Sequence, residues 1–274
     1  MAAIKVGIVG CAGHMGRMNL AAAAASGDCE IAAASEHPDS TWVGRDVGDL
    51  IGEKPLGILV EAAPDPVFAR SDVVIDFTLP AASKAHVAAA AEHRTALVLG
   101  TTGLSAAQQA DVVEAAEHAA ILQAANMSLG VNLLLELVTQ AAAVLTPEYD
   151  IEVLEMHHRR KVDAPSGTAL ALGQAAAAGR QVDLNEVSQR VRDGHTGERR
   201  SGDIGFATLR GGSVIGEHTV IFAGEGERVE ITVRSQSRAT YAAGALRAAR
   251  WLRGRDAGLY DMFDVLGLKS PGAV

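Results

Sequence analysis

The chain has 274 residues, 48% of them hydrophobic and only 4% aromatic, and a formal net charge of -9 at pH 7. This length is sufficient for two domains with sizeable cores. The negative charge and the few aromatic side chains argue against a nucleic-acid partner, which requires basic surface and stacking platforms.

Two cysteines, Cys11 and Cys29, suit a reducing compartment without a disulfide framework. The N-terminus runs directly into a predicted strand, without a charged lead and an apolar signal region. No apolar run is long enough to span a membrane. We therefore expect a cytoplasmic protein with no membrane partner.

The first segment predicts a βαβ unit that binds a dinucleotide. An apolar strand at 4–9 leads into the turn Gly10-Cys11-Ala12-Gly13-His14-Met15-Gly16, and an alanine-rich helix extends to about residue 26. A second strand, 29–35, ends at Glu36, roughly 20 residues after the last glycine of the turn, as in the dinucleotide-binding fingerprint. Such a turn also occurs in other α/β proteins, but its place between strand and helix, with the acid present, favours a dinucleotide.

We expect the cofactor's pyrophosphate to bind the amides of this turn, and Glu36 to accept hydrogen bonds from the adenosine ribose. A carboxylate there disfavours a 2′-phosphate unless a cation lies beside it. The candidates are His14 and His37, and histidine carries only partial charge near neutral pH. The sequence therefore predicts NADH or NADPH, with NADH used at least as well.

Strands and helices continue to alternate up to residue 128, which predicts a Rossmann-like, doubly wound parallel sheet. Strands are expected at 73–77, 96–99 and 120–123, and helices at 80–93 and 105–118, whereas 37–66 is mixed in character. Ligands of such sheets bind beyond the carboxyl ends of the strands. The residues at those ends are Thr78, Gly100-Thr101-Thr102-Gly103 and Ala124-Ala125-Asn126-Met127-Ser128. The 100–103 turn would lie beside the nicotinamide, although it could be an ordinary turn, and Asn126 is a cofactor contact or a structural amide.

The pattern changes beyond residue 132 and predicts a second, α+β domain with an open mixed sheet. Helices are expected at 133–145, 168–178 (stopping at Gly179) and 241–252, and strands at 150–156, 204–209, 214–222 and 228–234. The last helix and the tail are expected to return to the first domain. The predicted domains are therefore 1–128 with 238–274, which binds the dinucleotide, and 129–237, which binds the substrate.

The most distinctive stretch is Glu155-Met156-His157-His158-Arg159-Arg160-Lys161-Val162-Asp163-Ala164-Pro165-Ser166-Gly167-Thr168-Ala169, with five adjacent basic residues at 157–161. Proline and serine are helix start signals, so the amides of 166–168 lie at an open helix N-terminus, which binds carboxylate or phosphate. This combination predicts a pocket for a small dianion. No metal is expected, because adjacent histidines on a strand diverge and no cysteine pair lies nearby.

Clustered cations disfavour further protonation and a bound dianion restores it, so Lys161 would be cationic with substrate present and able to donate a proton. A surface role is favoured for four arginines, Arg159, Arg160, Arg210 and Arg238, although Arg210 and Arg238 could instead approach the cofactor or substrate. The polar loop 194–199 could cover the site or bridge subunits. Four histidines show no partner pattern: His86, His93, His118 and His218.

These segments resemble the 4-hydroxy-tetrahydrodipicolinate reductase (dihydrodipicolinate reductase) family of diaminopimelate and lysine synthesis over nearly the whole chain. The resemblance is carried by the runs at 6–17, 74–78, 100–103, 125–132, 155–169, 194–199 and 205–210. It implies a homotetramer assembled through the second domain's sheet. It also implies hydride transfer from NAD(P)H to the dicarboxylate ring formed by the preceding aldolase, with loss of water.

The resemblance further implies roles for single residues. His157 is the acid/base residue and Lys161 the proton donor, His158 contacts the substrate, and Gly167 and Thr168, next to Ser166, bind a carboxylate. The cofactor positions are 10–15, Glu36, His37, 100–102 and 124–127. His37 and His14 stand where NADPH-preferring members often have arginine, and Met127 where phenylalanine is frequent, which bears on cofactor preference and not on the chemistry.

Two other functions have the same layout. A dinucleotide-sensing protein would use the first domain without catalysis, but it would need no acid beside the nicotinamide, so the His157-to-Lys161 run argues against it. A reductase of another small substrate, such as an amino-acid aldehyde, would differ in not being inhibited by pyridine-2,6-dicarboxylate.

Overall fold

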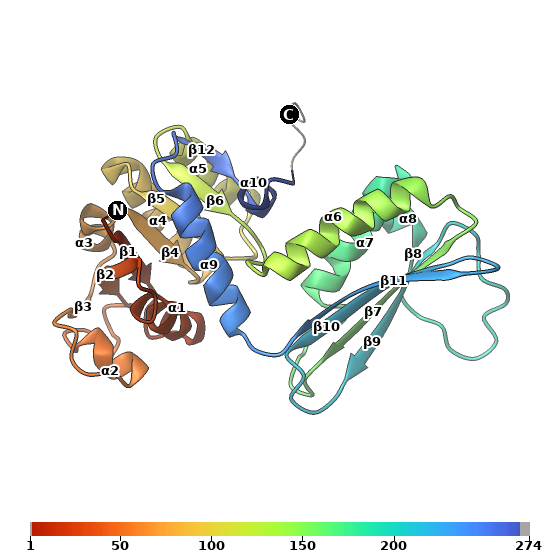
Figure 1. Cartoon of the computed structure of the whole chain (residues 1–274), viewed down its shortest axis with the longest axis horizontal. Helices are drawn as coiled ribbons and strands as arrows, with labels where there is room; N and C mark the ends of the chain where they lie inside the picture. Colours follow the sequence, from red (N-terminus) through yellow and green to blue (C-terminus); the bar gives the residue numbers. More distant parts are fainter. Residues whose placement is uncertain (1, 269–274) are drawn as a thin grey trace. The chain divides into compact units, whose positions relative to one another are not determined.

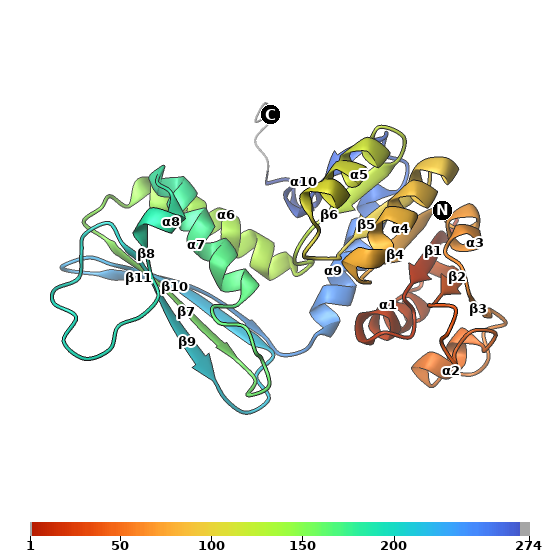
Figure 2. The same cartoon turned by 180° about the vertical axis from the view of Figure 1, so that it is seen from behind.

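The computed structural model describes residues 2–268, which form two compact units (Figures 1 and 2). The first unit comprises the residues up to Ser128 and those from Ala239 on, and the second comprises Leu129–Arg238. Arg238, predicted to open the return to the first domain, is the last residue of the second unit. Within the described part of the chain, no helix has both the length and the apolar character needed to cross a bilayer.

The described residues of the first unit form a seven-stranded sheet with all neighbours parallel. Its strands are β1 (Ile4–Val9), β2 (Cys29–Ser35), β3 (Val60–Glu61), β4 (Val73–Asp76), β5 (Ala96–Leu99), β6 (Ala120–Gln123) and β12 (Gly258–Tyr260). They lie in the order β12-β6-β5-β4-β1-β2-β3. The chain order reverses between β1 and β4, which is where a sheet of this kind binds its ligand.

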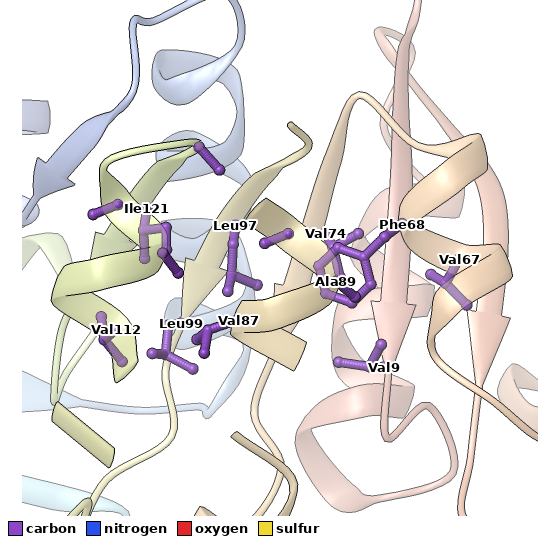
Figure 3. Packing of buried hydrophobic residues seen from close by; sticks show 14 of the residues in the cluster. Val9, Val67, Phe68, Val74, Val87, Ala89, Leu97, Leu99, Val112 and Ile121 are labelled. Carbon is purple, nitrogen blue, oxygen red and sulfur yellow. The ribbon is translucent and has the colours of Figure 1, made fainter. Parts of the chain in front are cut away.

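Helices cover both faces of this sheet. They are α1 (His14–Ala24), α2 (Val47–Ile51), α3 (Asp65–Arg70), α4 (Pro80–His93), α5 (Ala106–Ala116), α9 (Ala239–Leu252) and α10 (Met262–Leu266). The buried cluster in Figure 3 shows α3, α4 and α5 packing on one face, where Phe68 lies beside Val74 of β4 and Val87 lies beside Leu99 of β5. The other face contacts α1 and α9. The doubly wound fold class is thereby confirmed.

Two parts of the first unit were not predicted as elements. The mixed segment 37–66 contains α2, β3 and the start of α3, whose few residues are too short for a clear hydrophobic period. The tail adds β12 beside β6 and then α10. The end of the predicted return, from residue 269 on, lies outside the described residues.

The second unit is a mixed five-stranded sheet in the order β11-β10-β7-β9-β8. Its strands are β7 (Asp150–His157), β8 (Ser188–Gln189), β9 (Ile204–Arg210), β10 (Gly216–Ala223) and β11 (Arg228–Ser235). β7 and β8 pair with β9 in parallel, and β10 is antiparallel to β7 and β11. Consecutive strands without intervening helices thus form the predicted open mixed sheet.

Three helices lie on one face of this sheet: α6 (Leu129–Val144), α7 (Gly167–Arg180) and α8 (Leu184–Val187) (Figure 1). The prediction that α7 stops at Gly179 is wrong, because the helix continues to Arg180 and is capped by Gln181 at φ 56°. A Cβ at Gly179 would lie 2.3 Å from the Thr139 carbonyl oxygen. The glycine therefore permits close packing of α7 on α6 and is not a stop signal.

Candidate active site

The glycine-rich turn connects β1 to α1 in a conformation that demands glycine. Gly10 has φ +64°, a region that side chains disfavour. A Cβ at Gly16 would lie 2.1 Å from the Gly10 carbonyl oxygen, so the helix could not approach the turn with any other residue. Gly13 is the N-cap of α1 and makes no side-chain capping hydrogen bond, so no side chain of its own occupies the approach of a phosphate to this helix start.

Glu36 follows β2 and is hydrogen-bonded to this turn. Its Oε2 accepts the Ala12 N–H at 2.8 Å, and its Oε1 accepts the His37 N–H at 2.9 Å. The acid and the turn, recognised from their spacing in the sequence, are therefore one unit in space. Cys11 contributes only backbone here, because its side chain is buried and burial, followed by the charge of Glu36, raises the pKa of its thiol to about 12.

A cavity of about 610 Å³ opens beside Glu36 at the reversal of strand order. Its lining comes from the turn, the end of β2 and the segments around β3, β4 and α4, with Gly10, Gly13, Glu36, His37, Thr78 and His86 among them. The other cofactor candidates do not line this cavity: Cys11, Ala12, His14 and Met15 of the turn and α1, and 100–102 and 124–127, which follow β5 and β6. Its size, its apolar walls and its glycine turn fit part of a dinucleotide.

In the second unit, β7 directs alternate residues to the helix-covered face. Ile151, Val153, Glu155 and His157 are buried, and the residues between them are only half-buried. Glu155 is 1% exposed and His157 is 9% exposed. This face carries apolar residues at the start of the strand and ends in a buried acid and a buried base.

Glu155 accepts hydrogen bonds from three segments. His157 Nδ1 lies 2.5 Å from Oε2, the two terminal nitrogens of Arg210 lie at 2.8 and 2.9 Å, and the Ser166 N–H lies at 3.1 Å from Oε1. Burial alone would raise the pKa of Glu155, but the hydrogen bonds from Arg210 and His157 lower it below its ordinary value. Glu155 is therefore an ionised, fully engaged carboxylate.

The surroundings of His157 favour the uncharged form of its imidazole. Burial lowers the pKa of its imidazole, and the nearby charges of Lys161 and Arg210 act in the same direction, outweighing the hydrogen bond to Glu155. Because an ionised carboxylate only accepts, Nδ1 carries the proton and donates it to Glu155. Nε2 of the neutral ring is then a hydrogen-bond acceptor.

A second buried histidine lies against the first. The rings of His157 and His218 are 5.1 Å apart and nearly perpendicular, and His218 Nε2 lies 3.2 Å from Ser166 Oγ. Nδ1 of His218 has no hydrogen-bond partner among the described residues. Burial, followed by the charge that His157 would carry, lowers the pKa of His218 to about 4.

Helix α7 begins beside this network. Ser166 is its N-cap and accepts the Ala169 N–H at 3.1 Å, as its sequence position predicts. Gly167 is exposed, and no other described atom would come within 4 Å of a Cβ placed on it. The first turn of the helix is thus open to a ligand, next to the buried Glu155 and His157.

The rest of the basic cluster extends from the end of β7. Lys161 is 21% exposed, with its Nζ 2.8 Å from Asp163 Oδ1. His158 Nε2 lies 3.3 Å from a terminal nitrogen of Arg238, so the latter is not a simple surface charge. Arg159 and Arg160 are exposed, which agrees with the surface role predicted for them.

Three residues of this site were missed in the sequence: Glu155, Arg210 and His218. The surface role predicted for Arg210 is wrong, because β9 pairs in parallel with β7 and sets Arg210 opposite His157. β10 sets His218 opposite Glu155 in the same way. Only Glu155 had a local signal, since it shares the alternation of Ile151 and Val153; the other two depend on strand register.

The polar loop that includes 194–199 lies at the other end of β7. Arg199 pairs with Asp150 and Glu152, and Arg192 pairs with Glu152. Strand residues rise by about 3.3 Å, so these contacts lie roughly 20 Å from His157. Within its own unit the loop therefore does not cover the site, and bridging between subunits stays a prediction.

A dinucleotide cavity in a parallel sheet and a separate acid–base site with an open helix end are features of the dinucleotide-dependent oxidoreductases with two domains.

Comparison with known proteins specifies the family. The family model "Dihydrodipicolinate reductase, N-terminus" matches residues 4–127, and "Dihydrodipicolinate reductase, C-terminus" matches 130–266. The 4-hydroxy-tetrahydrodipicolinate reductases of Rhodopseudomonas palustris (strain BisA53) and Afipia carboxidovorans are 51% and 52% identical to this chain, over 98% of it in both cases and over 98% and 99% of their own lengths. The chain belongs to the dihydrodipicolinate reductase family, and the resemblance recognised in the sequence is confirmed.

A solved structure agrees with this assignment. The dipicolinate-bound dihydrodipicolinate reductase from Paenisporosarcina sp. TG-14 is similar to this chain with a TM-score of 0.75 and 25% sequence identity. The similarity covers 94% of this chain and 97% of that one. Both units of the fold are thus shared with an enzyme of the same family.

Proposed function

We propose that this chain reduces 4-hydroxy-tetrahydrodipicolinate with the residues at the end of β7 and the start of α7. The reaction is that of its family in diaminopimelate and lysine biosynthesis. The substrate gains a hydride and a proton, loses water and becomes tetrahydrodipicolinate. The observation that carries the proposal is the buried Glu155–His157 pair beside the open first turn of α7. Reduction of a dicarboxylate ring requires both anion-binding N–H groups and a residue that moves a proton.

The substrate's carboxylates are assigned to the basic cluster and the helix end. Gly167 and Thr168 supply backbone N–H groups and a hydroxyl, and Ser166 fixes the start of the helix through its cap. Lys161 and His158 lie on the segment that leads from β7 to this helix. A dianion at this position gains from the helix dipole and from charge-assisted hydrogen bonds.

His157 and Lys161 are assigned different proton roles. In the free protein His157 is neutral, with Nδ1–H directed to Glu155 and Nε2 able to accept. A bound dianion raises the pKa of His157, so that it can take up a proton and return it during the reaction. Lys161, whose ammonium has three donors, delivers the proton to the ring. Glu155 and Arg210 position His157 and do not themselves contact the substrate.

The first unit is assigned the nicotinamide cofactor, which supplies the hydride when bound. The turn 10–15 would bind the pyrophosphate and Glu36 the adenosine ribose, with His37 beside it, while 100–102 and 124–127 would contact the nicotinamide end. We propose that NADH is used at least as well as NADPH, because Glu36 repels a 2′-phosphate. Arg17, whose Nε donates to the Ala12 carbonyl at 2.9 Å, is a full cation near the turn and moderates that repulsion.

A cytoplasmic homotetramer is proposed as the working form. The face of the second unit's sheet opposite α6, α7 and α8 carries Leu154, Met156, Leu209 and Ile221, and Leu209 is 47% exposed. A sheet face that carries such apolar side chains among polar ones, and that no described helix of its own unit covers, is a natural interface for a second copy. The polar loop 194–199, at the edge of that sheet, would then bridge subunits.

A coupled spectrophotometric assay tests the function. Purified protein with the preceding aldolase and its substrates should oxidise NADH, and in a parallel run NADPH, and pyridine-2,6-dicarboxylate should compete with the substrate. Binding of NADH without oxidation would indicate the sensing protein. Oxidation without inhibition at millimolar pyridine-2,6-dicarboxylate would indicate a reductase of another substrate.

A further inference from the structure

A second buried carboxylate lies in the first unit, at the end of β4. Asp76 is 0% exposed, and its Oδ1 accepts the Thr78 N–H at 2.7 Å, the Thr78 hydroxyl at 2.6 Å and the Thr101 hydroxyl at 3.2 Å. Its Oδ2 lies 2.8 Å from Nδ1 of His86 on α4. Every donor to this carboxylate is a neutral hydroxyl or amide, or a histidine ring.

These hydrogen bonds join three segments around one end of the sheet. Thr78 belongs to the loop after β4, Thr101 to the turn after β5, and His86 to the middle of α4. The main chain reinforces the arrangement, because the Gly100 N–H donates to the Asp76 carbonyl oxygen at 2.8 Å. The position of the 100–103 turn is therefore determined by both the backbone and the side chain of Asp76.

Two residues hydrogen-bonded to Asp76 border the dinucleotide cavity. Thr78 and His86 both line it, and so does Phe77, which precedes Thr78. A buried carboxylate with a histidine is a poor source of stability, since apolar residues of similar volume would often do as well or better. Such a pair holds the loops that are hydrogen-bonded to it in a single arrangement, and these loops lie at the end of the sheet where the ligand binds.

We propose that Asp76 and His86 are positioning residues for the nicotinamide cofactor. The pair fixes Thr78 at the cavity wall and fixes Thr101 in the turn assigned to the nicotinamide end, so that both loops are arranged before the cofactor binds. Preorganised loops bind more tightly because less ordering is required on association. The inference rests on the proposed cofactor site of the first unit and is independent of the chemistry assigned to the second.

His86→Leu and His86→Asn distinguish positioning from simple packing. An asparagine side-chain amide can replace Nδ1–H as the donor to Asp76, whereas leucine cannot. Loss of one buried hydrogen bond to a charged group should weaken NADH binding by about tenfold in the leucine variant. The asparagine variant should restore binding to within about threefold of wild type.

The matched control is His93→Leu, which removes another histidine–carboxylate pair from the same helix. His93 lies 2.7 Å from Asp65, but both residues are partly exposed and neither lines the cavity. This variant should leave NADH binding unchanged. NADH dissociation constants are measured by calorimetry without substrate, together with the melting temperature of each free protein.

A His86→Leu protein with wild-type NADH affinity would overturn the inference, as would equal weakening by leucine and asparagine. If the leucine variant does not fold, Thr101→Val and Thr101→Ser replace it. Valine lacks the hydroxyl that donates a hydrogen bond to Asp76, whereas serine retains it. Weakening by valine but not serine supports positioning, and equal affinities refute it. A wild-type protein that binds no NADH would overturn the cofactor assignment itself, which is a different result.

Discussion

Two carboxylate–histidine pairs, Asp76–His86 and Glu155–His157, lie at the carboxyl ends of strands, one in each unit. In both, the histidine directs Nδ1 to the carboxylate, at 2.8 Å and 2.5 Å. The pairs differ in their remaining partners. Asp76 accepts from threonine groups, whereas Glu155 accepts from a guanidinium and from an N–H at the start of a helix.

The difference assigns the two pairs different uses. The donors around Asp76 come from Thr78, Thr101 and His86 and fix the loops that follow β4 and β5, so the first pair arranges backbone. A guanidinium beside Glu155 adds positive charge next to the histidine, which helps to keep His157 neutral until an anion arrives. On the assignments proposed above, the same local chemistry would serve positioning in one unit and proton transfer in the other, according to the third partner.

The largest effect is expected from the second unit's proton donor. Lys161→Ala should lower turnover by about 10²-fold or more, the range for a lost general acid, and leave NADH binding nearly intact. Steady-state kinetics with the coupled aldolase and NADH titration of the free protein measure the two quantities. Unchanged turnover would mean that Lys161 is not the proton donor. The expected contrast with His86, whose loss should weaken NADH binding, would then be absent.

Glu155→Gln sharpens the comparison at the carboxylate itself. Turnover should fall by roughly 10- to 100-fold, because the amide orients His157 less well and does not stabilise its charged form. Glu155 raises the pKa of His157, so removing its charge should move the corresponding limb of the pH–rate profile to lower pH.

Glu152→Gln is the matched control for that variant. Glu152 lies on the same strand and is also held by arginines, Arg192 and Arg199, but at the opposite end from His157. Its turnover and pH profile should match those of wild type. A shift of equal size in the pH–rate profiles of both variants would mean that the net charge of the unit, and not the Glu155–His157 hydrogen bond, sets the pH dependence of turnover.

The pH dependence of stability separates the two units. The pKa of His218 falls from 6.5 to about 4 on folding, so the unfolded chain takes up a proton first as pH is lowered, and stability is lost between pH 6.5 and about 4. By pH 5 this loss should be about 2 kcal/mol. Asp76, with a folded pKa below 3.8, contributes stability that is lost only in more acidic solution.

His218→Leu tests that assignment. The variant should lose less stability than wild type between pH 7 and pH 5, because its leucine binds no proton in either state. Urea unfolding at the two pH values, followed by circular dichroism, measures the difference. If the variant lost as much free energy of unfolding between the two pH values as wild type, His218 would have its ordinary pKa and would be exposed to solvent in the folded protein.

The smallest effect concerns the end of the cavity beside Glu36. His37→Arg should lower the Michaelis constant for NADPH by about three- to tenfold, because a full cation there pairs with the 2′-phosphate. The Michaelis constant for NADH should change little. Parallel kinetics with the two cofactors measure it. An unchanged Michaelis constant for NADPH would show that the adenosine ribose does not bind at Glu36. It would not bear on the loops that Asp76 arranges.

Local spacing in the sequence determined much of this protein. The turn 10–16 with Glu36, the start of α7 at Ser166, and the run from His157 to Lys161 each depend on residues close together in the chain. Helix caps, glycine turns and strand alternation are set by hydrogen bonds and steric limits within a few residues. The family could therefore be recognised, and the doubly wound and mixed sheets could be predicted, from the sequence.

Tertiary structure alone decided which distant side chains meet. Arg210 and His218 reach Glu155 through the register of β9 and β10 on β7, and Thr101 and His86 reach Asp76 through the packing of β5 and α4. Gly179 carries a helix-end signal that close packing on α6 overrides. Register and packing depend on contacts between residues far apart in the chain, whose energies are summed over a whole core, and no short stretch of sequence specifies them.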